Sequence, residues 1–549
     1  MKIIFIYPFK SKLCAGPIKW LPLSSARLVS VLKIFFSNID FYHIDLENSI
    51  EKQIKKSYLS EDFNIIAKNI IDERCDVPSI KKVLKYRYFF DEIIKHFKLE
   101  KYDHYFFCLY GWNKKGIQAN LWLAKYLRYK FGSNKKIFFG GAGVDKFSRN
   151  KKIFNYLKQN HKQKNPVNFI DSFIFGFSGE WATKALIKDI IQKKNLKKIY
   201  TDKEFIKKEG VKKYYKKRLN FIPDFDNFID FNYFSYSYKN LESFYRINTD
   251  IKKKNKKVLF IPYFFSSGCF FGRCAYCPSS GTDFNYVCKP TEEVVKDLKT
   301  LKNKYKSSYF IFYNDNFNND LNYTKKLLKS IINHRLNILF TDSFNLLLLD
   351  NEIISLMKKA GIFRVDLGLS TCDSVLQEKY DMLIKDNSLL KKIKFLSKEG
   401  IWIQVNMIGN FPFQYSSNKD HEVLEKYIDY IDSVTYNDYL LYRFSRLGKN
   451  YKNYNLSLVS RDVKGLNDNY TVTDKPELAF LENNFKGTIE ERLEIFKQIH
   501  DNNINFFKNN NLIINDVNLY LLGFLYKEWG FKKDKIKKKV IEAWKNIKN

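Results

Sequence analysis

Three cysteines within nine residues are the side chains of this chain best suited to chemistry. Cys269, Cys274 and Cys277 lie in the run Ser266-Ser-Gly-Cys-Phe-Phe-Gly-Arg-Cys-Ala-Tyr-Cys-Pro278. Three thiolates this close, with no second cysteine pair beside them, suit a cubic iron–sulfur cluster in which one iron has no protein ligand. That iron is free to bind a small molecule. Gly268 and Gly272 allow the backbone to wrap tightly around such a cluster.

A structural zinc site is the alternative interpretation of the same cysteines. Zinc usually takes four ligands, arranged in two paired knuckles. The fourth ligand would have to be Cys288, which lies eleven residues after Cys277 and has no partner at C-x2-C spacing. The spacing therefore favours the cluster over zinc.

The cysteine run resembles the cluster loop of radical S-adenosylmethionine (SAM) enzymes, in which the free iron chelates the methionine part of SAM. The usual family spacing is C-x3-C-x2-C, whereas four residues separate Cys269 from Cys274 here. The C-x2-C half with its aromatic Tyr276 matches, and so does the preceding Ser-Ser-Gly. The resemblance implies that Cys269, Cys274 and Cys277 hold a 4Fe–4S cluster and that SAM is bound beside it.

From residue 256 onward the sequence alternates between strand-like and helix-like segments. The predicted strands cover 258–263, 309–313, 338–341, 364–368, 401–407 and 433–440, and the predicted helices 291–305, 323–333, 351–360, 388–400 and 420–431. Six such units suit the partial (β/α)6 TIM-type barrel of radical SAM enzymes. In barrels of this kind the chemistry takes place at the carboxyl ends of the strands.

Polar groups follow three of these strands where the family binds SAM. Asp315 lies in Asn314-Asp-Asn-Phe317 and resembles the acidic tip after the second strand. Ser370 stands where the family usually has a glutamate set against the SAM ribose. Gly409 lies in Met407-Ile-Gly-Asn-Phe-Pro412, which is similar to the turn beside the adenine. The resemblance implies that Asp315, Ser370 and Gly409 bind SAM, and a plain turn at the barrel rim is the alternative for each.

Cys372 is a candidate catalytic residue because it follows the fourth predicted strand and so comes near the barrel mouth. A thiol there is able to donate a hydrogen atom to a substrate radical, as an epimerase requires. The alternative is a small, partly buried core residue, since free cysteines are commonly buried.

Residues 1–200 predict a parallel sheet wrapped by helices. The predicted strands cover 3–7, 41–44, 105–110, 136–139 and 172–175, and two helices are predicted at 21–36 and 116–131. Their order resembles the flavodoxin-like (Rossmann-type) cobalamin-binding domain that precedes the barrel in one class of radical SAM enzymes. Gly111, Gly140 and Gly141 are therefore candidates for binding cobalamin, because glycines let a flat ligand approach the backbone. The chain has no D-x-H-x-x-G signature, so a domain that has kept the fold and lost the cofactor stays open.

The length of 549 residues predicts about three domains. We assign an α/β domain to 1–200, a linker to 201–255, the barrel to 256–450 and a mainly helical accessory segment to 451–549. Eight cysteines in a chain of this length do not indicate a disulfide framework, and no apolar run resembles a signal or membrane segment. We therefore predict a cytoplasmic protein without membrane association. The net charge of +36 accompanies many Lys, Asn and Ile residues, so we ascribe it to compositional bias and do not expect nucleic acid as a partner.

The resemblance implies reductive cleavage of SAM at the cluster, which starts radical chemistry on an unactivated carbon. With cobalamin present, the implied reaction is C-methylation of a peptide or small natural product, driven by an electron donor such as flavodoxin or ferredoxin. Three alternatives remain: a cobalamin-independent epimerase or rearrangement enzyme, a tRNA methylthiotransferase and a zinc-stabilised nucleic-acid-binding protein.

Overall fold

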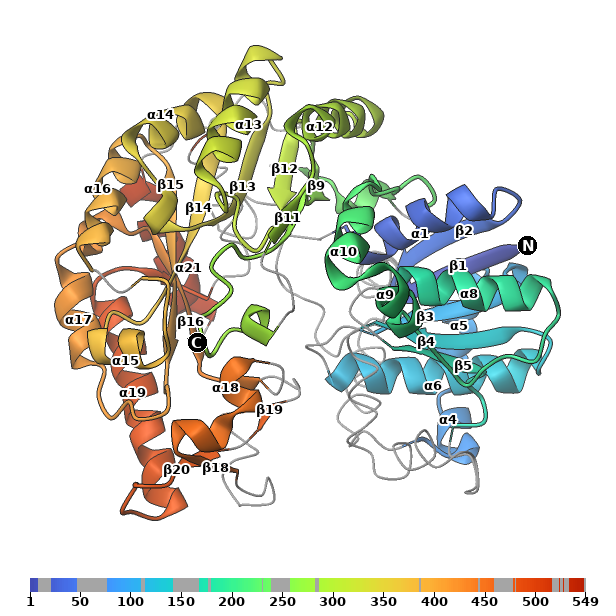
Figure 1. The fold of residues 1–549 in the computed structure, drawn as a ribbon. Helices are drawn as coiled ribbons and strands as arrows, with labels where there is room; N and C mark the ends of the chain where they lie inside the picture. The colour runs from blue at the N-terminus through green and yellow to red at the C-terminus, as the bar shows by residue number, and fades with distance from the viewer. Residues whose placement is uncertain are drawn as a thin grey trace.

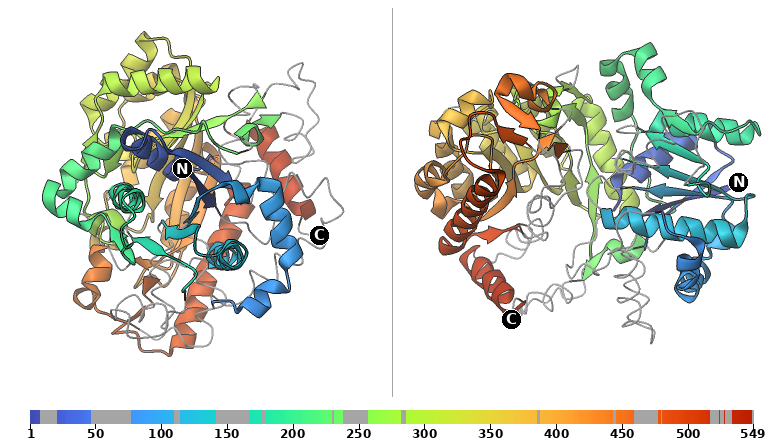
Figure 2. Two further views of the ribbon diagram at one scale, coloured as in Figure 1. Left: turned by 90° about the vertical axis from the view of Figure 1, so that its right-hand side faces the viewer. Right: turned by 90° about the horizontal axis from the view of Figure 1, so that it is seen from below.

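The computed structural model describes residues 1–7, 21–46, 77–109, 114–141, 167–175, 179–229, 231–237, 257–281, 286–384, 387–442, 445–458, 477–478, 480–515, 523, 527 and 533–547. The described residues form an N-terminal α/β unit and a larger α/β barrel beside it (Figures 1 and 2). This arrangement confirms the fold class expected from the sequence. Within the described ranges, no helix combines the length and apolar character that a membrane span needs.

The N-terminal unit is built on six parallel strands in the order β2-β1-β3-β4-β5-β6. The strands are β1 (Lys2–Tyr7), β2 (Asp40–Asp45), β3 (His104–Cys108), β4 (Lys136–Gly140), β5 (Ser172–Phe175) and β6 (Ile199–Thr201). This is the flavodoxin-like order, in which strands are added to one side of β1 and then to the other, and the switch between β1 and β3 leaves a crevice at their carboxyl ends. The short β6 was not predicted, because three residues are too few to show a strand pattern.

Helices cover both faces of this sheet. One apolar layer lies between the sheet and the pair α1 (Leu23–Phe35) and α8 (Glu180–Ile191), and a second lies beneath α5 (Arg87–Phe97) and α6 (Lys114–Phe131). The short α4 (Ile80–Leu84) packs beside α6. Because successive side chains of a strand point to opposite faces, strands buried on both faces are apolar throughout, as Ile3-Ile-Phe-Ile6 is.

Two helices and an extended segment join the two units. Helices α9 (Lys203–Glu209) and α10 (Val211–Leu219) follow β6. The chain then runs along the edge of β2, where the His43 N–H donates to the Asn227 carbonyl at 3.1 Å and the Ile229 N–H donates to the His43 carbonyl at 2.9 Å. The segment expected to be a linker therefore contains helices and pairs with the N-terminal sheet.

The barrel has seven parallel strands in the order β9-β12-β13-β14-β15-β16-β21. They are β9 (Phe260–Tyr263), β12 (Tyr309–Phe312), β13 (Leu339–Phe344), β14 (Ile362–Ser370), β15 (Trp402–Gly409), β16 (Ser433–Asp438) and β21 (Ile513–Ile514). The first six are the predicted ones. The seventh comes from the segment expected to be mainly helical, and within the described residues β21 and β9 do not pair, so the barrel is partial.

Helices surround this barrel, with smaller elements at its rim. The helices are α12 (Thr291–Tyr305), α13 (Leu321–Asn333), α14 (Asn351–Ala360), α15 (Ser374–Lys379), α16 (Lys391–Lys398), α17 (Asn418–Glu425), α18 (Arg446–Lys449), α19 (Ile489–Asn509) and α21 (Lys533–Ile547). The short strand pairs are β7 (Tyr236–Ser237) with β8 (Lys257–Val258), β10 (Ser266–Gly268) with β11 (Tyr286–Cys288), β17 (Leu441–Tyr442) with β19 (Glu477–Leu478), and β18 (Leu456–Leu458) with β20 (Phe480–Glu482).

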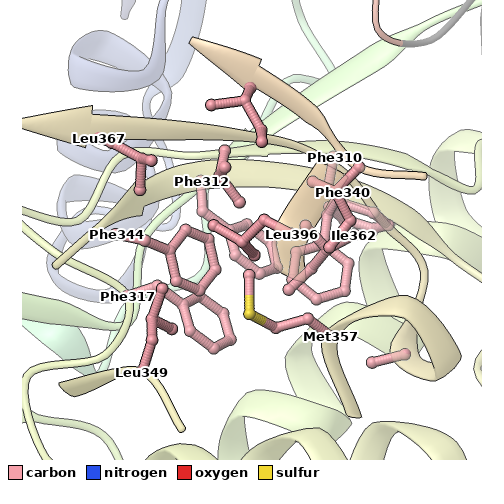
Figure 3. Close-up of a cluster of buried hydrophobic side chains, with 14 of the residues drawn as sticks. Phe310, Phe312, Phe317, Phe340, Phe344, Leu349, Met357, Ile362, Leu367 and Leu396 are labelled. Carbon is pink, nitrogen blue, oxygen red and sulfur yellow. The ribbon is translucent and has the colours of Figure 1, made fainter. Parts of the chain in front are cut away.

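Aromatic side chains fill the layer between the barrel strands and their helices. Phe312 and Phe340 stack with ring centroids 4.9 Å apart, and Met357 of α14 lies against this layer (Figure 3). Gly361 ends α14 with a φ of +100°, and a Cβ there would lie 2.0 Å from the Ile338 carbonyl oxygen. This core fixes the strands, and with them the loops at their carboxyl ends.

Candidate functional site

The three cysteines lie in a loop that leaves the barrel after β9. This cluster loop, residues 269–277, follows strand β10, which pairs antiparallel with β11. Gly268 and Gly272 have φ values of +88° and +58°, which favour glycine. Gly272, with its left-handed backbone, lies within the longer first spacing between Cys269 and Cys274.

The three thiols are half-buried. Burial raises the pKa of Cys274 to about 12, and the neighbouring Cys277 adds to the shift. Burial also raises the pKa of Cys277. Thiolates in such surroundings need nearby cationic charge, which bound iron would supply, so the donor set fits a cluster.

Among the described residues, no three His, Cys, Asp or Glu side chains converge tightly enough to surround one metal ion. A cubic cluster does not require such convergence, since each thiolate binds a different iron. Cys288 pairs with Ser266 across the β10–β11 hairpin, so it lies on the hairpin that carries the cluster loop and not in the loop itself, and its thiol is within electrostatic reach of Lys216 of α10.

Asparagine and aspartate side chains after β12 fix the backbone that leads into the cluster loop. The Asn314 Oδ1 atom accepts from the Phe265 N–H at 3.0 Å and from the N–H and hydroxyl of Ser266, both at 2.9 Å. Its Nδ2 atom donates to Asp342 of β13 at 2.6 Å. The Asp315 carboxylate accepts from the Gly268 N–H at 2.7 Å. Asp315, which the sequence placed at the SAM site, therefore holds the backbone of Gly268, directly before the cluster loop.

Two further amides complete this set of contacts. The Asn316 Nδ2 atom lies 3.8 Å from the Cys269 sulfur, to which it donates. Asn319 accepts from the Phe270 N–H at 3.2 Å and donates to the Gly268 carbonyl at 3.1 Å. The sequence analysis did not name Asn314, Asn316 or Asn319 as site residues. All three lie in a polar run directly after a buried strand, which was a signal for them.

Ser370 lies at the end of β14 and is joined to the cluster loop. Its hydroxyl is 2.6 Å from that of Tyr276. The backbone of Ser370 is left-handed, with a φ of +63°, at an irregularity where β14 pairs with β15. The Tyr276 ring packs edge-on against Phe411, which follows β15, with centroids 5.4 Å apart. The structure therefore brings together two of the three loops that the sequence assigned to SAM.

Gly409 has a packing role at the end of β15. A Cβ at this position would lie 1.9 Å from the hydroxyl oxygen of Tyr436, a residue of the core between the strands and helices. The absence of a side chain at Gly409 is thus explained by Tyr436. Its backbone is still at the barrel rim, where the sequence placed it.

Cys372 does not join the other predicted site residues. Its side chain is 3% exposed and belongs to the core between the barrel strands and their helices. Burial raises the pKa of the thiol well above its ordinary value. This placement does not favour hydrogen-atom donation to a substrate at the barrel mouth.

Inside the barrel, polar side chains line the space enclosed by β9–β16, which we call the lumen. Val365 and Leu367 of β14 face the helices, so the alternating Arg364, Asp366 and Gly368 face the lumen. Arg364 is buried, forms an ion pair with Asp366 and donates to the Gln404 Oε1 atom at 2.6 Å.

The always protonated guanidinium of Arg364 sets the direction of the next hydrogen bonds. Because the guanidinium can only donate, the Gln404 side chain must turn its oxygen toward Arg364 and its Nε2 atom away from it. That Nε2 atom donates to the Asn406 Oδ1 atom at 3.1 Å and to the Thr435 hydroxyl at 2.5 Å. The Asn406 amide nitrogen and the Thr435 hydroxyl proton are left as donors.

These donors border open space. Gly368, Asn406 and Thr435 are paired across β14, β15 and β16. Among the described residues, a Cβ added at Gly368 would meet nothing within 4 Å, and Asn406 and Thr435 are only half-buried. The lumen can therefore receive a ligand that presents a hydrogen-bond acceptor. A separate cavity of about 520 Å³ lies at the opposite end of the barrel, lined by residues such as Asn337 and Lys359, and has no contact with the cluster loop.

The crevice of the N-terminal sheet is the candidate cobalamin site. Gly140 and Gly141 lie at the carboxyl end of β4, and a Cβ at Gly141 would be 2.6 Å from the Leu109 carbonyl oxygen. Gly111 lies outside the described residues. Tyr7 ends β1, and its hydroxyl lies 3.0 Å from that of Ser24 on α1. The absence of a side chain at Gly141 is thus explained by its close approach to Leu109, and both glycines lie at the carboxyl edge of the sheet, where the sequence placed the cobalamin site.

A family model described as the Radical SAM superfamily matches residues 263–414. These residues include the cluster loop, Asp315, Ser370 and Gly409. The chain contains a radical SAM domain. A radical SAM domain implies a 4Fe–4S cluster and SAM, and Cys269, Cys274 and Cys277 are the three thiols that such a cluster needs here.

Solved structures share the fold over nearly the whole chain. The radical SAM methyltransferase TsrM from Kitasatospora setae, with cobalamin and a [4Fe-4S] cluster bound, is 12% identical, with 99% of each chain covered and a TM-score of 0.55. The cobalamin-dependent SAM radical enzyme OxsB, with aqua-cobalamin and SAM bound, is 11% identical, covering 98% of this chain and 71% of its own, with a TM-score of 0.56. No curated protein matches the chain. At these identities the likeness concerns the fold, which includes both the N-terminal unit and the radical SAM domain.

Proposed function

We propose that this protein is a cobalamin-dependent radical SAM methyltransferase that acts on an unactivated carbon of a peptide or small natural product. The observation that carries the proposal is the likeness of the fold over 99% of the chain to TsrM, a radical SAM methyltransferase with cobalamin and a [4Fe-4S] cluster bound. The printed descriptions of TsrM and OxsB both name cobalamin.

The bound groups would supply the reactive chemistry: the cluster and SAM a 5′-deoxyadenosyl radical, and cobalamin the methyl group. The protein's own residues would hold these groups and orient the substrate. Cys269, Cys274 and Cys277 would ligate three irons, and Asn316 would donate a hydrogen bond toward the Cys269 sulfur. Such hydrogen bonds to cluster sulfurs tune the reduction potential.

The lumen would orient the substrate. The donors of Asn406 and Thr435 would take an acceptor oxygen, such as a carbonyl of a peptide or of a small natural product. Their direction is fixed by the buried Arg364 through Gln404, so the site is organised before the substrate arrives. The barrel walls would also shield reactive species from water.

Anaerobic purification with cobalamin supplied, followed by iron, sulfide and cobalt analysis, tests the proposal. We expect about four irons per chain, stoichiometric cobalt, and reductant-dependent formation of 5′-deoxyadenosine. Iron without cobalt would instead favour an epimerase or rearrangement enzyme. Zinc without iron would contradict the radical SAM assignment itself.

Cysteine variants make the test specific. Cys274→Ala should lose iron and 5′-deoxyadenosine formation together, because one of three cluster ligands is removed. Cys288→Ala and Cys372→Ala are matched controls, since both thiols lie outside the cluster loop, and each should keep its iron. Equal loss of iron in Cys288→Ala would count against the assigned ligand set.

A further inference from the structure

Helices α9 and α10 form a strongly basic surface. Residues 203–218 contain eight Lys or Arg and two Glu, a ratio of four to one, whereas the whole chain contains 95 Lys or Arg and 59 Asp or Glu. The local excess of positive charge is thus well above the excess that the composition alone gives. Such an excess raises the local concentration of acidic partners.

This surface lies beside the hairpin that carries the cluster loop. Helix α10 packs on the β10–β11 hairpin that carries the loop, where Leu219 of α10 and Val287 of β11 form a buried pair, with Val211, Tyr215 and Phe264 packed against it. Asp315 lies between α10 and the loop, since its carboxylate accepts from the Gly268 N–H at the start of the loop and its charge reaches Tyr215 of α10. Burial is the main cause that raises the pKa of both Tyr215 and Cys277, and the Asp315 charge adds to it in each. Asp315 therefore lies within electrostatic reach of α10 and of a predicted cluster ligand.

Part of the positive charge is neutralised within the protein. Lys213 and Lys217 pair with Glu209, at 2.8 and 3.1 Å, and Arg218 pairs with Glu180 at 3.2 Å. The remaining lysines are exposed and form no ion pair within the described part of the chain. These five residues, which we call the α9–α10 basic face, are Lys203, Lys207, Lys208, Lys212 and Lys216.

We propose that the α9–α10 basic face is the docking surface for an acidic, low-potential electron-transfer protein of the flavodoxin class. The inference rests on the radical SAM part of the proposed function, which requires a reductant. One electron would leave the reduced flavin of the partner, oxidising it by one step, and would enter the cluster, which is reduced by one. Docking beside the β10–β11 hairpin keeps the path to the cluster loop short.

Charge reversal on the full-length protein tests this surface. In the variant Lys208→Glu/Lys212→Glu/Lys216→Glu, three members of the face carry negative charge. The matched control is Lys306→Glu/Lys359→Glu/Lys398→Glu, which changes three exposed lysines at the C-terminal ends of α12, α14 and α16 by the same total charge. The probe is a purified, oxidised bacterial flavodoxin, and its dissociation constant is measured at low and high salt.

We expect the basic-face variant to bind flavodoxin at least about tenfold more weakly at low salt, with the difference reduced at high salt, because screening removes long-range attraction. Formation of 5′-deoxyadenosine with flavodoxin as reductant should fall in parallel. With dithionite, a small reductant that needs no docking surface, the rate should stay at the wild-type level. The control variant should behave as wild type in all three measurements.

Two outcomes would overturn the inference: unchanged flavodoxin binding in the basic-face variant, or equal weakening in the control variant, which would indicate a general charge effect. A variant that loses affinity for a purified tRNA but not for flavodoxin would also overturn it, in favour of nucleic-acid binding. If the wild type forms no 5′-deoxyadenosine even with dithionite, the proposed function fails. The flavodoxin dissociation constants would still show whether the α9–α10 basic face is the docking surface.

Discussion

The hydroxyl of Tyr276 lies 2.6 Å from the hydroxyl of Ser370, although 94 residues separate them in the chain. This hydrogen bond joins the cluster loop, which follows β9, to the end of β14. Two regions that the sequence assigned to different parts of one cofactor site are therefore held in a fixed relation. Burial raises the pKa of Tyr276 above its usual range, so the hydroxyl remains protonated at neutral pH.

Tyr276→Phe should weaken SAM binding about three- to tenfold, because a hydrogen bond of this kind contributes about 0.5–1.5 kcal/mol. Iron content should not change, since the cysteines are untouched. Equilibrium binding of SAM to the reconstituted protein measures the effect. Ser370→Ala should give a similar loss, and the double variant should lose little more. Fully additive losses would show that the two hydroxyls act independently.

Asn314→Ala should destabilise the protein by about 2–4 kcal/mol, because it leaves two backbone N–H groups and a buried hydroxyl without their acceptor. The free energy of unfolding, from denaturant titration, provides the measurement. Asn316→Ala is the control on the neighbouring position. Its amide has a long contact to the Cys269 sulfur, so stability should hardly change. Similar losses in both variants would contradict the role given to Asn314.

Arg364→Leu should cost about 3–5 kcal/mol of stability, because it leaves the buried Asp366 carboxylate without its cation. The double variant Arg364→Leu/Asp366→Leu should recover much of that loss, since a buried ion pair is often replaceable by apolar side chains. Thermal unfolding of the two variants compares them directly. A double variant no more stable than the single one would show that the pair is needed for the lumen to fold.

His43 should make the N-terminal unit sensitive to acid. Its ring is fully buried, stacks on Phe228 with centroids 5.0 Å apart, and is hydrogen-bonded to the Ser25 hydroxyl at 2.9 Å. Burial lowers the pKa of His43 to about 3. In the unfolded chain a histidine takes up a proton near pH 6.5, whereas in the folded protein His43 does so only near its lowered pKa. Stability is therefore lost as the pH falls through this interval.

The loss from His43 alone should reach about 2 kcal/mol at pH 5, relative to neutral pH. In His43→Phe the stacking surface is kept and the titrating group removed, so the decline between pH 7 and pH 5 should be smaller by that amount. Unfolding free energies at both pH values measure the difference, and carboxylates common to both proteins cancel. An identical decline in the variant would show that His43 does not titrate as its burial requires.

Much of the fold follows from local sequence patterns. Short apolar runs such as Ile3-Ile-Phe-Ile6 and Phe138-Phe139 are buried strands because both faces are covered. Gly361 and Asp350 mark the end and the start of α14 through local backbone chemistry. The strand β21 could not be predicted, since two residues, Ile513 and Ile514, become a strand only by pairing with β16. Its stability comes from a distant partner rather than from its own pattern.

By itself, the sequence determined the residue types and spacing of the cluster loop and the order of the α/β units. These are local properties: three thiols in one loop need no tertiary contact to lie near one another. Only the tertiary structure decided that Cys372 is buried in the core, that Gly409 makes room for Tyr436, and that Gln404 turns its donors toward Asn406 and Thr435. Each of these depends on a partner from another strand or helix, and the distances between such partners are set by packing and not by the spacing of residues along the chain.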